Sequence, residues 1–99
     1  MEVIKNLNGD VLSVKLVGRL DTTTAPTLES ELSNEMSKAK TLEFDFSELD
    51  YVSSAGLRVL LACQKQMNKQ GTMSIKHVKD EIYDVFNMTG FLEILNVQK

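Results

Sequence analysis

The sequence predicts an α/β domain built around a mixed β-sheet. Short β-prone runs alternate with segments in which apolar residues recur at helical spacing. Strands that alternate with helices are typical of a mostly parallel sheet with right-handed crossovers. The first two strand-like runs have no helix between them, so we expect the sheet to open with an antiparallel hairpin.

The first half of the chain predicts two strands, a helix and a third strand. Residues 3–7 and 11–17 are β-prone and flank Asn8-Gly9-Asp10, where Asn-Gly tolerates the positive φ of a tight turn. The threonines at 22–24 offer hydroxyl caps, and Pro26 fits the first turn of a helix. Apolar residues then recur at helical spacing: Leu28, Leu32, Met36 and Ala39. Residues 42–46 alternate between apolar and acidic, which predicts a strand.

The second half predicts two more helices around one more strand. Ser53 or Ser54 can cap a helix whose buried side would carry Leu57, Leu60, Leu61 and Met67. Gly71 stands where a C-cap glycine belongs, and residues 72–78 read as the next strand. Asp80 can cap a third helix that stops at Gly90. Residues 91–95 fit either a short final helix or an extended tail.

Composition limits the functions that fit the chain. Its 99 residues are expected to form one domain, residues 1–99. A net charge of −3 argues against nucleic-acid binding and gives no polybasic signal for anionic membranes. No apolar run reaches the ~18 residues of a membrane span, and the N-terminus lacks the build of a signal peptide. We therefore expect a cytoplasmic protein without a membrane partner.

Few residues offer catalytic or metal-binding chemistry. The single histidine, His77, falls in a predicted strand with no partner at metal-ligand spacing, and the single cysteine, Cys63, falls among apolar helical residues. No phosphate-binding loop, dinucleotide fingerprint or nucleophile elbow is present. We therefore expect that the protein is not an enzyme and that it holds no metal or cofactor.

One segment combines structural and regulatory properties. At the predicted start of the second helix, Ser53 or Ser54 can satisfy a free backbone N–H as an N-cap. The same helix end carries partial positive charge, so it can accommodate a phosphate added to an exposed serine. The two roles are compatible.

This segment resembles the signature of anti-sigma factor antagonists, which carry the STAS domain. The resemblance lies in residues 45–61, DFSELDYVSSAGLRVLL. Two further stretches are similar to the family in the right order. Residues 18–26 match its first strand–helix junction, and residues 85–95 match its C-terminal helix–glycine–helix. The resemblance implies a mixed sheet with helices packed mainly on one face.

The resemblance also implies a partner-switching role. An unphosphorylated antagonist binds an anti-sigma factor that is also a serine kinase, and this binding frees the sigma factor. The kinase phosphorylates the serine two residues before the motif glycine, and a metal-dependent phosphatase reverses the reaction. Here that serine is Ser54, two before Gly56, while Ser53 replaces the usual acid and is a rival site. The residues expected to contact the partner are Asp21, Thr22, Ser53, Ser54, Ala55, Gly56, Leu57 and Arg58.

Two other functions remain open. One is a STAS interaction or small-ligand module that does not switch, in a signalling or lipid-transport assembly. It would bind its partner equally well after Ser54→Asp. The other is a small hydrolase that uses Ser54, which would need His77 as its general base.

Overall fold

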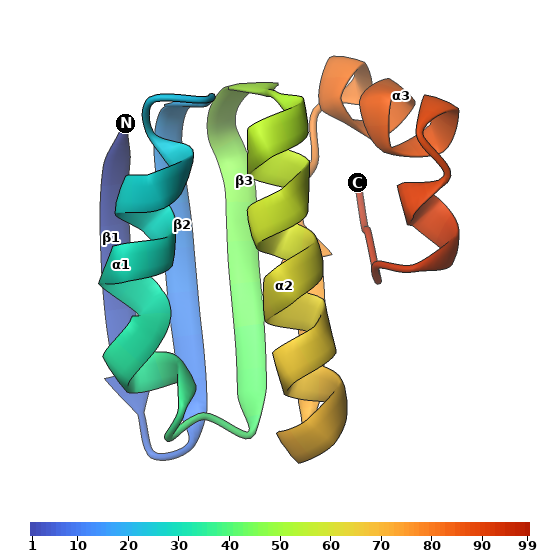
Figure 1. Cartoon of the computed structure of the whole chain (residues 1–99). Coiled ribbons are helices and arrows are strands. Elements are labelled where there is room, and N and C mark those ends of the chain that lie inside the picture. The colour runs from blue at the N-terminus through green and yellow to red at the C-terminus, as the bar shows by residue number, and fades with distance from the viewer.

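The computed structural model describes residues 1–99 and confirms the expected order of strands and helices (Figure 1). The strands are β1 (Glu2–Asn8), β2 (Val11–Leu20), β3 (Thr41–Val52) and β4 (Thr72–Lys76). The helices are α1 (Ala25–Met36), α2 (Ser54–Gln70) and α3 (Asp80–Met88), and a 3-10 turn, η1 (Phe91–Glu93), follows α3. Of the two structures left open for residues 91–95, the short helical turn is present and the extended tail is not.

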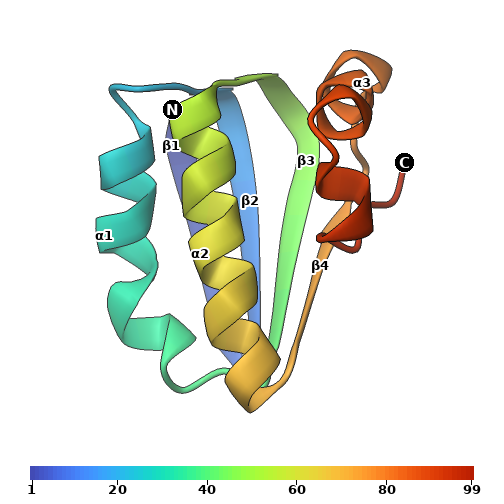
Figure 2. The ribbon, with the colours of Figure 1, turned by 45° about the vertical axis from the view of Figure 1, so that its right-hand side comes forward.

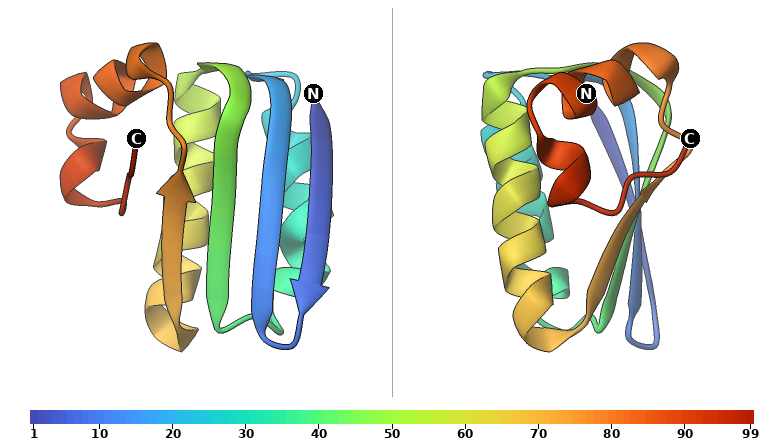
Figure 3. Two further views of the ribbon diagram at one scale, coloured as in Figure 1. Left: turned by 180° about the vertical axis from the view of Figure 1, so that it is seen from behind. Right: turned by 90° about the vertical axis from the view of Figure 1, so that its right-hand side faces the viewer.

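The four strands form one mixed sheet in the order β1-β2-β3-β4. β1 is antiparallel to β2, whereas β3 is parallel to both of its neighbours. The crossover helices α1 and α2 lie side by side on one face of this sheet (Figure 2). The opposite face carries no helix, and α3 and η1 lie beyond the β4 edge (Figure 3). This arrangement confirms the predicted fold class.

The hairpin between β1 and β2 has a two-residue loop. Asn8 pairs with Val11, which leaves Gly9 and Asp10 between the strands. Gly9 has φ +64°, a conformation that glycine adopts without steric cost. The carbonyl of Asp10 accepts hydrogen bonds from the backbone N–H groups of residues 40 and 41, which anchors the hairpin to the start of β3.

Strand β3 is much longer than the sequence pattern predicted. The alternation that ends at Phe46 is interrupted because β3 contains two irregularities opposite β2. Val17 pairs with Glu48 and Arg19 pairs with Tyr51, so β3 accommodates an extra residue twice. The strand therefore continues to Val52 and ends directly before α2.

The core fills the space between the sheet and its helices. The inward residues of β3 include Phe44 and Phe46, whose ring centroids lie 5.9 Å apart. Phe86 of α3 stacks on Phe46 at 6.4 Å and so ties the C-terminal helix to the sheet. The predicted apolar positions of the first two helices are buried, except that Leu61 is only half-buried. Ala39 was predicted within the first helix but lies beyond its end at Met36.

Several local predictions are wrong in detail. Gly71 follows α2 as expected, but its φ of 177° is extended, and it is required because an added Cβ would lie 1.8 Å from the carbonyl oxygen of Lys40. Strand β4 ends at Lys76, so His77 lies outside it, exposed and with φ 60°. Lys79 and not Asp80 occupies the N-cap position of α3, and Asp80 lies in its first turn.

Candidate functional site

The candidate site lies where the ends of β2 and β3 meet the start of α2. Figures 1 and 2 show the β2–α1 loop and the first turn of α2 at the same end of the molecule. The backbone N–H of Ser53 donates a 2.8 Å hydrogen bond to the carbonyl of Leu20. This bond joins the segment before α2 to the last residue of β2.

Gly56 allows α2 to approach β2 this closely. A Cβ atom at Gly56 would lie 2.7 Å from Cγ of Leu20 and 3.0 Å from its carbonyl oxygen. Both distances are shorter than ordinary van der Waals contact, so any other residue would force the helix away from the strand. The first turn of α2 is therefore seated directly on the end of β2.

Ser53 is the N-cap of α2. Its backbone is extended, at φ −89° and ψ 172°, and its Oγ accepts a 3.2 Å hydrogen bond from the N–H of Gly56. The side chain is half-buried. Of the two serines that the sequence left as possible caps, Ser53 is thus committed to holding the helix end.

Ser54 is the first residue of α2 and is exposed. Its hydroxyl makes no hydrogen bond within the chain, unlike that of Ser53. The two neighbouring serines therefore differ: one hydroxyl is used internally, and the other is free to react or to contact a partner.

Asp21 organises the turn that lies beside α2. Its Oδ1 accepts hydrogen bonds of 3.0 Å from the backbone N–H groups of both Thr23 and Thr24. The bond from the Thr24 N–H is the main reason why the pKa of Asp21 lies below its ordinary value. Thr24 occupies the N-cap position of α1 without a capping bond, and its hydroxyl instead donates 2.8 Å to the carbonyl of Arg19. The expected threonine cap is therefore absent, and the Asp21 carboxylate holds the turn that precedes α1.

The eight residues expected to contact a partner fall into three groups by exposure. Thr22, Ser54 and Arg58 are exposed, and Asp21, Ser53 and Ala55 are half-buried. Gly56 and Leu57 are buried by the chain itself. The structure thus brings all eight residues to one end of the molecule. Gly56 and Leu57 are not accessible to a partner there and instead pack beneath the exposed residues.

Two further residues at this end were not predicted as site residues. Arg19 and Tyr51 pair across β2 and β3, and the guanidinium carbon of Arg19 lies 4.2 Å from the centre of the Tyr51 ring. Both side chains are exposed. Arginine and tyrosine are enriched in the energetic centres of protein interfaces. Their pairing depends on the irregular register of β3, which no local pattern in the sequence reveals.

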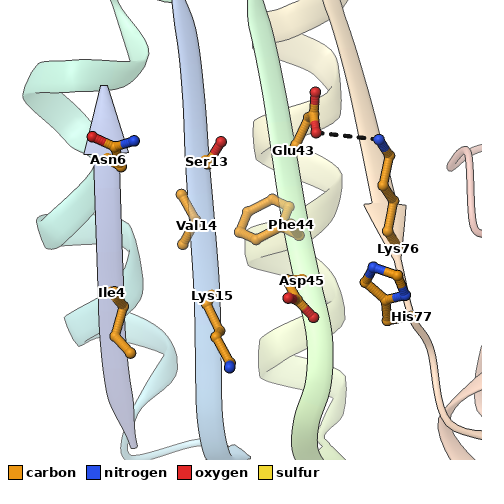
Figure 4. A pocket seen from close by; sticks show the side chains of 10 residues that line it. All are labelled: Ile4, Asn6, Ser13, Val14, Lys15, Glu43, Phe44, Asp45, Lys76 and His77. Atoms are coloured by element: carbon orange, nitrogen blue, oxygen red, sulfur yellow. Dashed lines mark hydrogen bonds and ion pairs between the residues drawn. The ribbon is translucent and has the colours of Figure 1, made fainter. Parts of the chain in front are cut away.

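The uncovered face of the sheet contains a shallow hollow of about 380 Å³ (Figure 4). Its charges are largely paired: the ammonium group of Lys76 lies 3.2 Å from Glu43, and Lys15 pairs with Glu48. His77 also lines this hollow. Ser54 instead begins a helix on the other face, so the hydrolase hypothesis finds no imidazole beside its nucleophile.

The remaining reactive groups do not form a catalytic or metal site. Cys63 is buried on α2 beside the groove between α1 and α2, and desolvation raises the pKa of its thiol to about 11, which disfavours the nucleophilic thiolate. No group of three or more His, Cys, Asp or Glu side chains is arranged to hold a metal ion. No helix combines the length and apolarity needed to cross a membrane.

The sequence profile of the STAS domain matches residues 2–99. This chain belongs to the STAS domain family. It is also 38% identical over 84 residues to BtrV of Bordetella bronchiseptica, a proposed anti-sigma factor antagonist, with 83% of this chain and 72% of BtrV covered. The STAS domain described here is thus a member of the anti-sigma factor antagonist family and not an enzyme.

Solved structures show the same fold. An anti-sigma factor antagonist from Mycobacterium paratuberculosis superposes with a TM-score of 0.88 at 20% identity, covering 98% of this STAS domain and 84% of that chain. The phosphorylated form of the Bacillus cell fate determinant SpoIIAA gives a TM-score of 0.76 at 15% identity, covering 99% and 92%. These superpositions confirm the fold that the family resemblance implied.

Proposed function

We propose that this STAS domain is a cytoplasmic anti-sigma factor antagonist whose binding is switched off by phosphorylation of Ser54. In its unphosphorylated form it binds an anti-sigma factor that is also a serine kinase, and so frees a sigma factor. The kinase transfers the γ-phosphoryl group of ATP to Oγ of Ser54, releasing ADP and a proton. A metal-dependent phosphatase hydrolyses the phosphoester and restores binding.

The observation that carries this proposal is the contrast between Ser53 and Ser54. A kinase needs a hydroxyl that is exposed and free of internal hydrogen bonds, and Ser54 meets both conditions. Phosphorylation of Ser53 would disrupt the N-cap that it supplies to Gly56. The geometry therefore supports Ser54 over its rival.

The replacement of the family's usual acid by Ser53 is compatible with this role. Aspartate and serine are both among the preferred N-cap residues. Ser53 can thus perform the capping that an acid would perform here, and the position of Ser54 on the helix does not depend on a carboxylate before it.

The phosphate would weaken binding without refolding the domain. It adds about −1.5 to −2 charges at neutral pH, in a chain whose net charge is already −3. At an interface that must exclude water, this charge adds repulsion and desolvation, and each ~1.4 kcal/mol lowers affinity tenfold. The first turn of α2 is held by Leu20, Ser53 and Gly56, so it need not move.

The proposal is tested by capture from the native cell followed by phosphosite mapping. The bait proteins are wild type, Ser54→Asp, Ser54→Ala and Ser53→Ala. We expect wild type and Ser54→Ala to capture an anti-sigma kinase and Ser54→Asp to capture none. With that kinase and ATP, wild type and Ser53→Ala should be labelled and Ser54→Ala should not. Label that persists on Ser53 in Ser54→Ala would overturn the assignment.

The non-switching interaction module remains a second candidate, because no acid precedes Ser54. In that case wild type and Ser54→Asp would capture the same partner equally, and no label would appear on either serine.

A further inference from the structure

Helix α2 carries an unusual distribution of charge. Its three cations are Arg58, Lys65 and Lys69, and it contains no acidic residue. All three side chains are exposed, and none takes part in an ion pair or lies over an aromatic ring. In contrast, most lysines of the strands and the β4–α3 loop are paired with carboxylates. The exposed side of α2 is therefore a basic ridge on an acidic protein.

Ser54 lies on the same side of the helix as this ridge. Successive helical residues are about 100° apart, so Arg58 is offset from Ser54 by about 40° and Lys65 by about 20°. Residues four apart are direct neighbours on a helix surface, with Cβ atoms about 5–6 Å apart. Arg58 is consequently the one cation of α2 within a single turn of the Ser54 hydroxyl.

No other group competes strongly for Arg58. The one acid in the β2–α1 turn is Asp21, whose Oδ1 already accepts two backbone hydrogen bonds and whose Oδ2 lies 3.8 Å from Arg19. On α1, Glu29 lines the groove between the two helices, farther along α2 beside Val59 and Cys63, and makes no ion pair with Arg58. The guanidinium of Arg58 is therefore free for a new anion.

We propose that Arg58 is the internal counter-ion of phosphorylated Ser54. This inference rests on the proposed function, because it concerns the same phosphorylation site. Before phosphorylation, the guanidinium is available to an acidic group of the partner. The phosphate then pairs with it across one helical turn, as guanidinium and phosphate groups do with two parallel hydrogen bonds. Phosphorylation thus adds a negative charge and also withdraws a positive one from the same surface.

The experiment measures the second pKa of phosphoserine 54 by 31P NMR. Phosphoserine is incorporated at position 54 during synthesis, so neither the kinase nor the partner is needed. The pKa is compared in wild type, Arg58→Gln and the matched control Lys65→Gln, which removes a cation from the same ridge but three turns away from the phosphate. Circular dichroism checks that all three proteins are folded.

We expect Arg58→Gln to raise the phosphate pKa by about 0.2–0.4 units, the size that exposed (i, i+4) ion pairs produce. Lys65→Gln should leave it within about 0.1 units of wild type, because its charge is screened at that separation. Equal pKa values in wild type and Arg58→Gln would overturn the proposal. An equal rise of the phosphate pKa in both variants would also overturn the proposal. It would indicate that the phosphate senses the general positive charge of α2 and does not pair with Arg58. Either result leaves the assignment of Ser54 as phosphorylation site untouched.

Discussion

A Cβ atom added to Gly56 would lie 2.7 Å from Cγ of Leu20. This relationship fixes the position of α2, because the helix that begins with Ser54 can rest on the end of β2 only where a side chain is missing. The hydrogen bond from Ser53 N–H to the Leu20 carbonyl, at 2.8 Å, holds the same junction from the backbone. The start of α2 is therefore anchored to the end of β2 both by packing and by a backbone hydrogen bond.

Gly56→Ala should destabilise the domain by about 1–3 kcal/mol through overpacking against Leu20. Urea unfolding measures this free energy. Leu20→Ala removes the crowded methyl groups, so the double variant Leu20→Ala/Gly56→Ala should cost less than the two single variants added together. If the losses of unfolding free energy of the two single variants added up to that of the double variant, the close approach of Gly56 to Leu20 would not be the reason for glycine at position 56.

Ser53→Ala should lower the free energy of unfolding by about 1 kcal/mol, because α2 loses its N-cap. Ser53→Asp should retain most of the stability, since its carboxylate can accept the same bond from Gly56. Ser54→Ala is the matched control and should change stability by less than about 0.5 kcal/mol. If Ser54→Ala were the more destabilising of the two alanine variants, the roles assigned to the serines would be reversed.

Gly71→Asn should destabilise by at least about 2 kcal/mol, because its Cβ would collide with the backbone at Lys40 and force strand β4 away from β3. Gly9→Asn is the matched control. Gly9 has a positive φ, which asparagine tolerates, and open space around it. Gly9→Asn should therefore lower the stability of the domain only slightly. Thermal unfolding of the two variants compares these costs, and similar melting temperatures would contradict the packing argument.

Asp21 should make stability depend on pH in the acid range. The pKa of its carboxyl in the folded protein lies below the ordinary value of an aspartate, chiefly because it accepts the backbone hydrogen bond of Thr24. A carboxylate with a depressed pKa contributes its stability above the unfolded pKa and loses it as the pH falls through the folded pKa. Asp21→Asn should therefore be less stable than wild type at pH 7, and the gap should narrow below about pH 4.

The control for this titration is Asp84→Asn, on the exposed side of α3, where the carboxylate makes no hydrogen bond or ion pair. Its stability curve should run parallel to that of wild type between pH 7 and 3. A gap between wild type and Asp21→Asn that stays constant over the same range would argue that Asp21 acts through packing and not through its charge.

The sequence predicted the element order because that order depends on local periodicity. Leu28 and Leu32 mark the buried side of α1, and Asn8-Gly9 marks the hairpin, without help from distant residues. The full length of β3 was not predictable, because its irregularities after Asp45 are visible only when it is paired with β2. The tertiary reason for Gly71 was equally hidden, since it depends on Lys40, far away along the chain.

The candidate site was predicted in outline because its motif is also a local feature of the sequence. The motif placed Ser53 and Ser54 at the start of a helix, but only the backbone conformation shows which serine is the cap. Arg19 and Tyr51 were missed because their contact arises from strand register.

The most direct test of the central claim is calorimetric titration of the purified cognate anti-sigma kinase, without ATP, with two forms of this domain. One form is unmodified and the other carries phosphoserine at position 54. The account predicts that the phosphorylated form binds at least about tenfold more weakly, a loss of about 1.4 kcal/mol. Equal affinities for the two forms would contradict it.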